Sequence, residues 1–317
     1  MNHTVAIDLG GTIIKIGLLK SGLLIDQTEI KAQSASGLKA QLPELVKAVN
    51  KMLQANQLLP ADVFGIGFSF AGLVDSSKNR ILSTNQKYDD GPDTDLVGWA
   101  LEKWNWPLFA ENDARMALLG EWKYGAGQGC ENIVMVTLGT GIGSAVLIEG
   151  KFLKGKHFQA GNLSGHFTVN HRGTICTCGN KGCMESEAST WRLPELIRTN
   201  PGHELSSLKL ENLLDYEALF RNAKNGDCLA LKILDHCYSV WSSGIISMIH
   251  AFDPEIIIIC GGIMKSGSVI LPELQTRINQ YAWTPWGKVK LLEARNINTS
   301  ALFGADYLVR SSLNIAQ

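Results

Sequence analysis

Two strand–turn–strand segments with glycine-rich turns restrict the folds open to this chain. The apolar runs VAIDLG and IIKIGLL are joined by Gly10-Gly11-Thr12, and NIVMVTLGTGIGSAVLIEG repeats that design over residues 132–150. Strand signals of this kind alternate with helical ones, such as the apolar spacing from Leu42 to Leu53. The alternation predicts an α/β protein.

Length and composition limit the classes of protein that remain. A chain of 317 residues is too long to fold around one simple hydrophobic core, so we expect two domains. Its 45% hydrophobic and 19% charged residues are typical of a folded globular protein. The net charge of −1 argues against a nucleic-acid or membrane-surface partner. The start lacks a signal-peptide pattern, and no apolar stretch has bilayer length, so we expect a cytoplasmic protein with no membrane partner.

The glycine turns DLGGT and LGTGIG place small residues where backbone N–H groups can approach an anion. Neither has the Lys-Ser/Thr of a Walker loop, and neither fits the dinucleotide fingerprint. Asp8 follows a buried strand beside the first turn, where a carboxylate can hold hydrated Mg²⁺. A turn-capping Asp is an equally good interpretation of the local sequence.

The tripeptide Glu111-Asn112-Asp113 comes at a strand end and just before a helical segment, where sites of α/β proteins form. A carboxylate such as Asp113 can accept the proton of a sugar or alcohol hydroxyl. Helix capping by Asn112 or Asp113 is the alternative, and the tripeptide alone favours capping.

A compact cluster of metal-ligand residues lies in GHFTVNHRGTICTCGNKGCME, residues 165–185. One histidine and three thiols are a donor set that closes a tetrahedral, structural Zn²⁺ site. A disulfide or a redox pair fits less well, since the compartment is expected to be reducing and the spacing is not Cys-x-x-Cys. The expected ligands are His166, Cys176, Cys178 and Cys183.

These motifs together resemble the ROK family of sugar kinases. The resemblance rests on DLGGT, AGLVD (71–75), ENDA (111–114), LGTGIG (138–143), the zinc block and CGG (260–262), which span nearly the whole chain. It implies an actin-like/hexokinase-like (ribonuclease H-like) fold, with ATP and sugar bound in a cleft between two domains. It also implies ATP-dependent phosphorylation of a sugar hydroxyl, typically O6 of a hexose, often by a homodimer.

The resemblance also implies domain boundaries and residue roles. We expect a smaller domain over 1–111, completed by the C-terminal helix at 300–317, and a larger domain over 112–299 with the zinc loop at 166–185. Asp113 would be the general base. The substrate-binding residues would be Asn112, His166, Glu185, Gly72 and Asn85. The residues that position ATP and Mg²⁺ would be Asp8, Gly10, Gly11, Thr12, Thr140, Gly141, Gly261 and Gly262.

One position departs from the family pattern. The family carries Glu three residues before the zinc histidine, and this chain has Leu163 there. Asn162 or Ser164 could substitute if the loop shifts. Because an apolar group replaces a sugar-binding carboxylate, we expect a preferred sugar other than glucose or an N-acetylhexosamine bound in the usual way.

Two other classes of protein share parts of this pattern. ROK repressors carry a DNA-binding helix-turn-helix ahead of the kinase-like part, whereas here the first glycine motif already begins at Asp8. A non-catalytic sugar sensor would be expected to lose the base or a phosphate loop, and both are present. The sequence therefore favours the kinase, with the sensor as the alternative.

Overall fold

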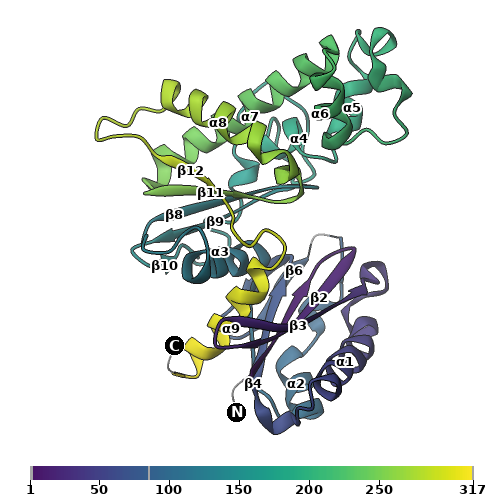
Figure 1. Ribbon diagram of the computed structural model, residues 1–317, viewed down its shortest axis with the longest axis vertical. Coiled ribbons are helices and arrows are strands. Elements are labelled where there is room, and N and C mark those ends of the chain that lie inside the picture. The colour runs from purple at the N-terminus through teal and green to yellow at the C-terminus, as the bar shows by residue number, and fades with distance from the viewer. Residues whose placement is uncertain (1–2, 85, 316–317) are drawn as a thin grey trace. The chain divides into compact units, whose positions relative to one another are not determined.

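The chain separates into two compact units. The computed structural model describes residues 3–84 and 86–315. The first unit contains the chain up to Gly129 together with Lys154–Ala160 and the residues from Arg295, and the second contains Cys130–Leu153 and Gly161–Ala294. Figure 1 labels the helices and strands and colours them by residue number.

The first unit is built on a sheet in the order β3-β2-β1-β4-β7. β1, β2 and β3 are antiparallel neighbours, whereas β1, β4 and β7 run parallel. Its strands are β1 (His3–Leu9), β2 (Ile13–Lys20), β3 (Leu23–Lys31), β4 (Val63–Phe70), β7 (Leu108–Asn112) and the separate pair β5 (Gly72–Asp75) and β6 (Arg80–Thr84). Its helices are α1 (Leu38–Ala55), α2 (Leu96–Trp104), α3 (Asp113–Tyr124), α9 (Ser300–Ser312) and the 3₁₀ turns η1 (Ser34–Ser36), η2 (Pro60–Asp62) and η3 (Gly91–Asp93).

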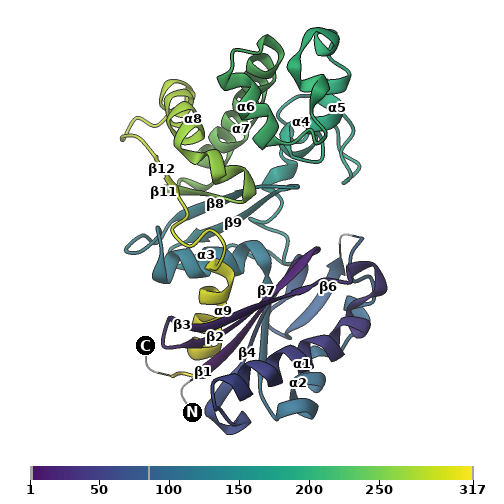
Figure 2. The ribbon, with the colours of Figure 1, turned by 45° about the vertical axis from the view of Figure 1, so that its right-hand side comes forward.

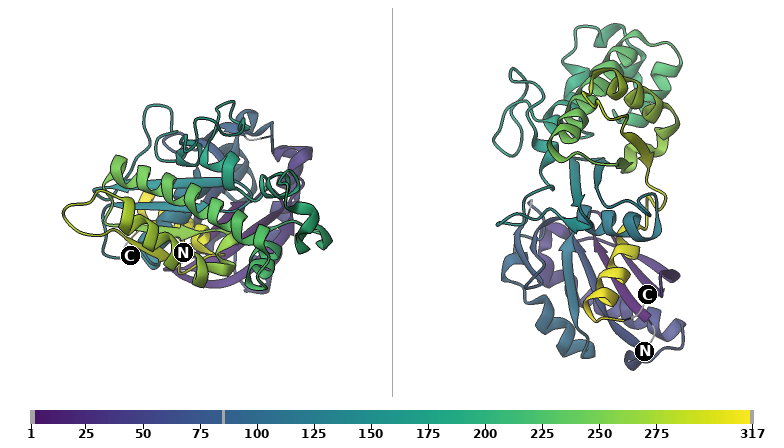
Figure 3. Two further views of the ribbon diagram at one scale, coloured as in Figure 1. Left: turned by 90° about the horizontal axis from the view of Figure 1, so that it is seen from above. Right: turned by 90° about the vertical axis from the view of Figure 1, so that its left-hand side faces the viewer.

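Alternation along β1 assigns the helices of this unit to two faces of the sheet. Val5 and Ile7 pack in the cluster that contains residues of α1 and α2, whereas Ala6 packs with residues of α3 and α9. α9, yellow in Figures 1 and 3, accordingly lies against the strands of the first sheet. The C-terminal helix thus completes the core of the N-terminal unit.

Helix α3 belongs to the first unit, although the expected boundary after Glu111 would assign it to the other domain. α3 and α9 approach closely through two glycines. A Cβ on Gly120 would lie 1.9 Å from the carbonyl oxygen of Ser300, and a Cβ on Gly304 would lie 1.9 Å from that of Met116. No larger residue fits this backbone contact, so the boundary of the compact unit falls one helix later than expected.

The second unit repeats the strand plan of the first, in the order β10-β9-β8-β11-β12. β10, β9 and β8 are antiparallel, and β8, β11 and β12 are parallel. Its strands are β8 (Ile133–Leu138), β9 (Ile142–Ile148), β10 (Lys151–Phe152), β11 (Ile256–Cys260) and β12 (Lys290–Glu293). Its helices are α4 (Met184–Ala188), α5 (Leu193–Arg198), α6 (Tyr216–Lys224), α7 (Cys228–Phe252), α8 (Gly267–Tyr281) and the 3₁₀ turns η4 (Ser164–His166), η5 (His203–Leu205), η6 (Ser207–Leu210) and η7 (Gly262–Ser266).

The helices of the second unit cover one face of its sheet, as Figures 1 and 2 show. Val134, Val136 and Leu138 on β8 point into one cluster with buried residues of these helices, Trp241 among them. α7 starts at Cys228, because the side chain of the preceding Asp227 accepts a hydrogen bond from the N–H of Ala230. Within residues 3–84 and 86–315, no helix is both long and apolar enough to cross a bilayer.

Candidate functional site

The first group of candidate residues gathers at the carboxyl ends of β1, β4 and β7. Parallel pairing aligns Asp8 with Ser69 and Ser69 with Glu111, and Asp113 follows two residues later at the start of α3. Carboxyl ends of parallel strands are where α/β sheets place their ligand sites. Strand register alone therefore brings Asp8 and Asp113 to one edge of the sheet.

Asp113 has one oxygen fixed and one available. Its Oδ1 accepts hydrogen bonds from the N–H of Ala114 at 2.8 Å and from Nδ2 of Asn112 at 2.9 Å. Among the described residues of this unit, none donates to Oδ2. Burial of the carboxyl, with the negative charge of Asp8 nearby, raises the pKa of Asp113 to about 6. Such a carboxylate is ionised at neutral pH and is basic enough to accept a hydroxyl proton.

Asn112 is the helix cap that the local sequence allowed. Its Oδ1 accepts from the N–H groups of Ala114 and Arg115, and its Nδ2 donates to the Gly72 carbonyl at 2.9 Å as well as to Asp113. These bonds use the full capacity of the amide. A sugar hydroxyl would therefore reach Asn112 only in exchange for one of them.

Gly72 is fixed by close packing. A Cβ there would lie 2.4 Å from the Ser83 carbonyl oxygen on β6, so the β5–β6 pair needs glycine at this position. The other predicted sugar-pocket residue in this region, Asn85, lies outside the described residues.

The Asp8 carboxylate is hydrogen-bonded to the neighbouring strand β4 and is largely shielded from solvent. Its Oδ1 accepts a 2.7 Å hydrogen bond from the Ser69 hydroxyl. Burial raises the pKa of Asp8, although Ser69 and Lys15 oppose the shift. A nearby cation stabilises the charged form of a carboxylate whose pKa is raised in this way, and Mg²⁺ prefers oxygen ligands. The donor chemistry therefore fits the expected role of Asp8.

The turn after Asp8 leaves backbone donors unused. Gly10 N–H closes the turn onto the Asp8 carbonyl. The hydroxyls of Tyr88 and Ser34 donate to the carbonyls of Gly10 and Gly11. By contrast, no described residue of the first unit accepts from the N–H groups of Gly11 and Thr12, which can therefore bind an anion.

Lys87 lies beside this turn, although no sequence motif indicates a role for it. A Cβ on Gly11 would lie 2.5 Å from its Nζ, so the ammonium group stands directly beside the glycine turn. No described acidic residue pairs with Lys87. The 74 residues between Thr12 and Lys87 hide this contact, and the hydrogen bonds of Tyr88 to Gly10 and Ser34 show how the loop is fixed.

The second phosphate-type loop, 139–141, is fixed by hydrogen bonds from the segment after α4. Thr190 N–H donates to the Gly139 carbonyl, and Trp191 N–H donates to that of Thr140. No described residue of the second unit accepts from the N–H groups of Thr140 and Gly141. This loop therefore presents free donors, as the first one does.

Glu185 lies beneath that loop. Its Oε2 accepts the N–H of Ile142 at 2.8 Å, and a Cβ on Gly141 would lie 2.5 Å from the same oxygen. The family resemblance implies only a sugar contact for Glu185. The structure shows that one carboxylate oxygen supports the loop, and that leaves Oε1 as the atom for a ligand.

Gly261 and Gly262 follow β11 beside the 139–141 loop. β8 and β11 are parallel neighbours, with Thr137 opposite Cys260. Gly261 has φ +101°, and a Cβ there would lie 2.2 Å from the Leu138 carbonyl oxygen, so only glycine fits.

A cavity of about 750 Å³ adjoins η7, which begins at Gly262. Tyr238 and Val269 supply apolar wall, and Lys224 and Lys265 supply positive charge, whereas Arg277 is paired with Asp235 and Glu273. Its size and mixed lining suit a heterocyclic base with an attached phosphate chain.

The predicted zinc ligands come together. One ligand atom each from His166, Cys176, Cys178 and Cys183 lies within 4.8 Å of all the others. The Cys178–Cys183 Sγ–Sγ distance is 3.7 Å, and an ideal tetrahedron with Zn–S bonds of about 2.3 Å has edges of about 3.8 Å. His166 faces the cluster through Nδ1, 3.5 Å from Cys176 Sγ, which leaves Nε2 for another partner. The donor set and its spacing fit structural zinc.

The zinc loop is attached to the second phosphate-type loop. Phe167, next to His166, accepts a backbone hydrogen bond from Met184, next to Glu185. A Cβ on Gly165 would lie 1.8 Å from the Ile142 carbonyl oxygen. His166 and Glu185 are thus placed on adjoining segments by the same part of the chain.

At the position that departs from the family pattern, Leu163 and its neighbour Asn162 differ in solvent exposure. Leu163 is 42% exposed, whereas Asn162 is 8% exposed, and both polar atoms of the Asn162 side chain are buried without a partner. Ser144 Oγ bridges the Gly161 carbonyl and the Ser164 N–H, and so fixes the turn. The polar group held inside this turn is therefore Asn162.

The chain is similar to known proteins over nearly its whole length. Residues 4–312 match the sequence profile of the ROK family. A glucokinase from Halalkalibacterium halodurans is 31% identical over 88% of this chain and 86% of its own length. The structure of a ROK hexokinase from Thermus thermophilus matches with a TM-score of 0.81 at 26% identity, over 99% of this chain and 100% of that one. The xylose repressor of Bacillus subtilis is 26% identical over 90% of this chain and 71% of the repressor.

Proposed function

The chain belongs to the ROK family. We therefore propose that it is an ATP-dependent kinase that phosphorylates the O6 hydroxyl group of a hexose or hexose derivative. Its fold is the two-domain hexokinase-like α/β fold of ROK sugar kinases. The glucokinase and hexokinase relatives support a sugar kinase. The observation that carries the proposal is the Asp113 carboxyl group, which has a raised pKa and leaves Oδ2 available. The glycine turn of the same unit has unused N–H donors.

In this proposal Asp113 accepts the hydroxyl proton through Oδ2. The two hydrogen bonds to Oδ1 fix the plane of the carboxylate, which limits the orientations that must be lost on reaction. The sugar oxygen, once deprotonated, attacks the γ-phosphorus, and the bond from that phosphorus to the ADP oxygen breaks. Asn112 orients a neighbouring hydroxyl by exchanging its bond to the Gly72 carbonyl, which leaves its bond to Asp113 in place.

The phosphates are held by unused backbone donors and by charge. In the first loop, Gly10 closes the turn and the N–H groups of Gly11 and Thr12 donate to phosphate. In the second loop, the N–H groups of Thr140 and Gly141 donate. Lys87 offsets charge on the transferring phosphate, since phosphoryl transfer depends on positioning and charge stabilisation. Asp8 is the carboxylate we assign to hold Mg²⁺, which when bound supplies the counter-charge for the phosphates. The adenosine is assigned to the cavity beside Gly261 and Gly262.

The sugar is oriented by the zinc loop. His166 contacts a hydroxyl through Nε2 while Nδ1 faces the cysteines, and Glu185 contacts another through Oε1. Gly72 and Asn85 are assigned to the pocket wall. Zinc, when bound, fixes the loop and takes no part in the chemistry. A metal-held ligand has little freedom left to lose, which favours precise positioning.

A sugar-binding regulator without kinase activity is the second candidate, because the xylose repressor is among the relatives. The intact Asp113 and both glycine loops favour the kinase. The two are separated by measuring ADP release and sugar binding on the same sample. The homodimer implied by the family resemblance stays a prediction, which sedimentation of the full chain tests.

A further inference from the structure

Two exposed tryptophans border a cavity that is lined by none of the proposed site residues. Trp283 and Trp286 lie in the segment between α8 and β12 and are 78% and 58% exposed. The cavity has a volume of about 500 Å³. Large exposed aromatic groups gathered at one place mark binding surfaces. It is lined by Ile249, His250, Asp253, Trp283, Thr284, Pro285 and Trp286.

The cavity is separate from the proposed site within its own unit. Asp253 precedes β11, which begins at Ile256, and Trp286 precedes β12, which begins at Lys290. The cavity therefore lies at the amino ends of these strands. The phosphate-type loop and Gly261 are at the carboxyl ends of the same sheet, so the cavity is not part of the substrate site.

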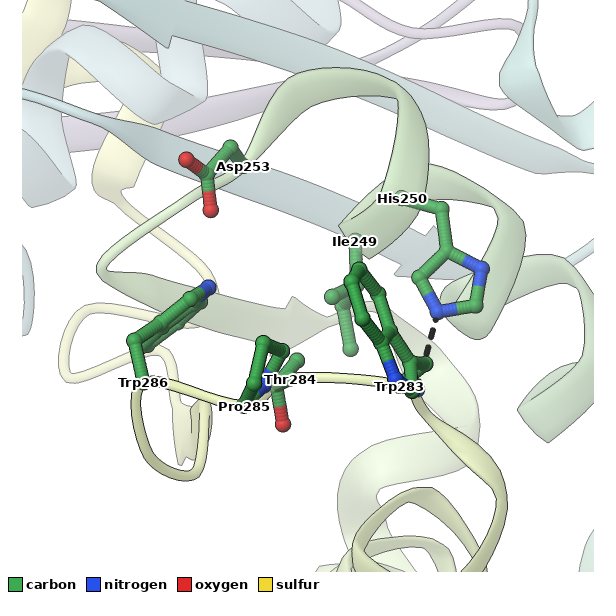
Figure 4. Close-up of a pocket in the computed structure, with 7 residues that line it drawn as sticks. All are labelled: Ile249, His250, Asp253, Trp283, Thr284, Pro285 and Trp286. Carbon is green, nitrogen blue, oxygen red and sulfur yellow. Dashed lines mark hydrogen bonds between the residues drawn. The ribbon is translucent and has the colours of Figure 1, made fainter.

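The tryptophan segment is held in place by the last turn of α7. The Trp283 backbone N–H donates to Nε2 of His250 at 3.0 Å, drawn as the dashed line in Figure 4. Because Nε2 accepts, the proton of the neutral imidazole is on Nδ1. Pro285 between the rings restricts the backbone further.

The polar groups of the cavity include both acceptors and donors. Figure 4 shows the Asp253 carboxylate above the space between the rings of Trp283 and Trp286. No described residue pairs with that carboxylate. The Thr284 hydroxyl and the indole N–H groups are donors, whereas Figure 4 shows the imidazole Nδ1 on the side of His250 turned away from Asp253 and Trp286. A binding site for a cation needs acceptors alone, whereas a ring of vicinal hydroxyls needs both kinds of group.

From this combination we propose that the cavity binds a pyranose ring of a saccharide, at a site distinct from the phosphorylation site. The indole faces cover the C–H face of the sugar ring, the contact that aromatic side chains make with flat apolar surfaces. Asp253 accepts hydrogen bonds from hydroxyls on the ring edge, and a charged acceptor makes these bonds strong. The inference does not rest on the proposed kinase activity.

The test uses the full chain labelled with 5-fluorotryptophan and observed by ¹⁹F NMR. The variants Trp283→Phe and Trp286→Phe assign the two resonances. Glucose, methyl β-glucoside, maltose and cellobiose are titrated separately. We expect both resonances to move along one saturation curve with at least one saccharide. Asp253→Asn should weaken that affinity about tenfold without changing ADP release, and Glu217→Gln, a control at an exposed α6 carboxylate, should not.

Three results would overturn the proposal. Resonances that move with none of the four saccharides exclude a sugar site. Resonances that move with protein concentration alone show that a second copy covers the tryptophans. Saturation by tetramethylammonium without any saccharide response assigns the cavity to cations.

Discussion

Replacing Asp113 by Asn removes the proposed proton acceptor and little else. The amide oxygen of Asn can still accept the Ala114 N–H bond that fixes the side chain. General-base catalysis contributes about 10²–10⁴-fold, so we expect kcat for sugar phosphorylation to fall by about that factor. KM for the sugar should change little. A coupled ADP-release assay measures both constants, and near-normal turnover would remove Asp113 as the base.

The pH profile provides a second readout of the same residue. The base acts only when deprotonated, and the pKa of Asp113 is raised to about 6 by burial and by Asp8. At about pH 5, roughly one-tenth of the carboxyl is ionised. We expect kcat/KM of the native enzyme to fall about tenfold from pH 7 to pH 5. The residual activity of Asp113→Asn should lack that decline.

Stability provides a readout that needs no turnover. The carboxyl pKa rises from 3.8 to about 6 on folding, so the folded state disfavours its charge and loses stability as pH rises through about 4 to 6. Two pKa units correspond to about 3 kcal/mol, which solvent screening of a partly exposed group reduces to roughly 1 kcal/mol.

Asp113→Asn should therefore unfold at higher urea near pH 7.5 than the native chain, with no difference below about pH 4. The exposed Asp93→Asn serves as the matched control and should show no such dependence. Equal stability of Asp113→Asn and the native chain at both pH values would refute the electrostatic argument.

Four further predictions follow from the same structure. Cys178→Ser should lose zinc by elemental analysis and raise KM for the sugar, and normal zinc content would exclude the ligand set. Lys87→Met should lower kcat about tenfold or more and leave sugar binding by calorimetry unchanged, since the ammonium faces the phosphate loop; unchanged kcat would remove Lys87 from the site. Gly261→Ala should destabilise the fold by about 1–3 kcal/mol in urea unfolding, because φ is +101° and Leu138 blocks the added methyl; native-like unfolding would contradict this. Leu163→Glu should shift preference toward glucose or N-acetylhexosamines in a sugar panel, and an unchanged profile would mean that this position does not contact the sugar.

Much of the site could be predicted because its signals are local. The zinc ligands fall within 18 residues and assemble as expected, and both glycine turns connect strands that pair with each other.

What could not be predicted depends on contacts between residues far apart in the sequence. Helix α3 joins the first unit because Gly120 meets α9 about 180 residues later. Lys87 reaches Gly11 through a loop with no motif, and Glu185 supports Ile142 through a bond that its spacing does not reveal. Exposure of Trp286 likewise depends on how its segment packs, which hydrophobicity does not indicate.

The central claim is tested most directly by a coupled ADP-release assay with ATP and Mg²⁺ over a panel of sugars. The panel contains glucose, mannose, fructose, allose, N-acetylglucosamine, N-acetylmannosamine and a β-glucoside, and thermal shift is measured on the same samples. The account predicts turnover on at least one sugar, with loss of that turnover in Asp113→Asn. Thermal stabilisation by a sugar without ADP release on any of them would contradict it and identify a sugar-binding regulator.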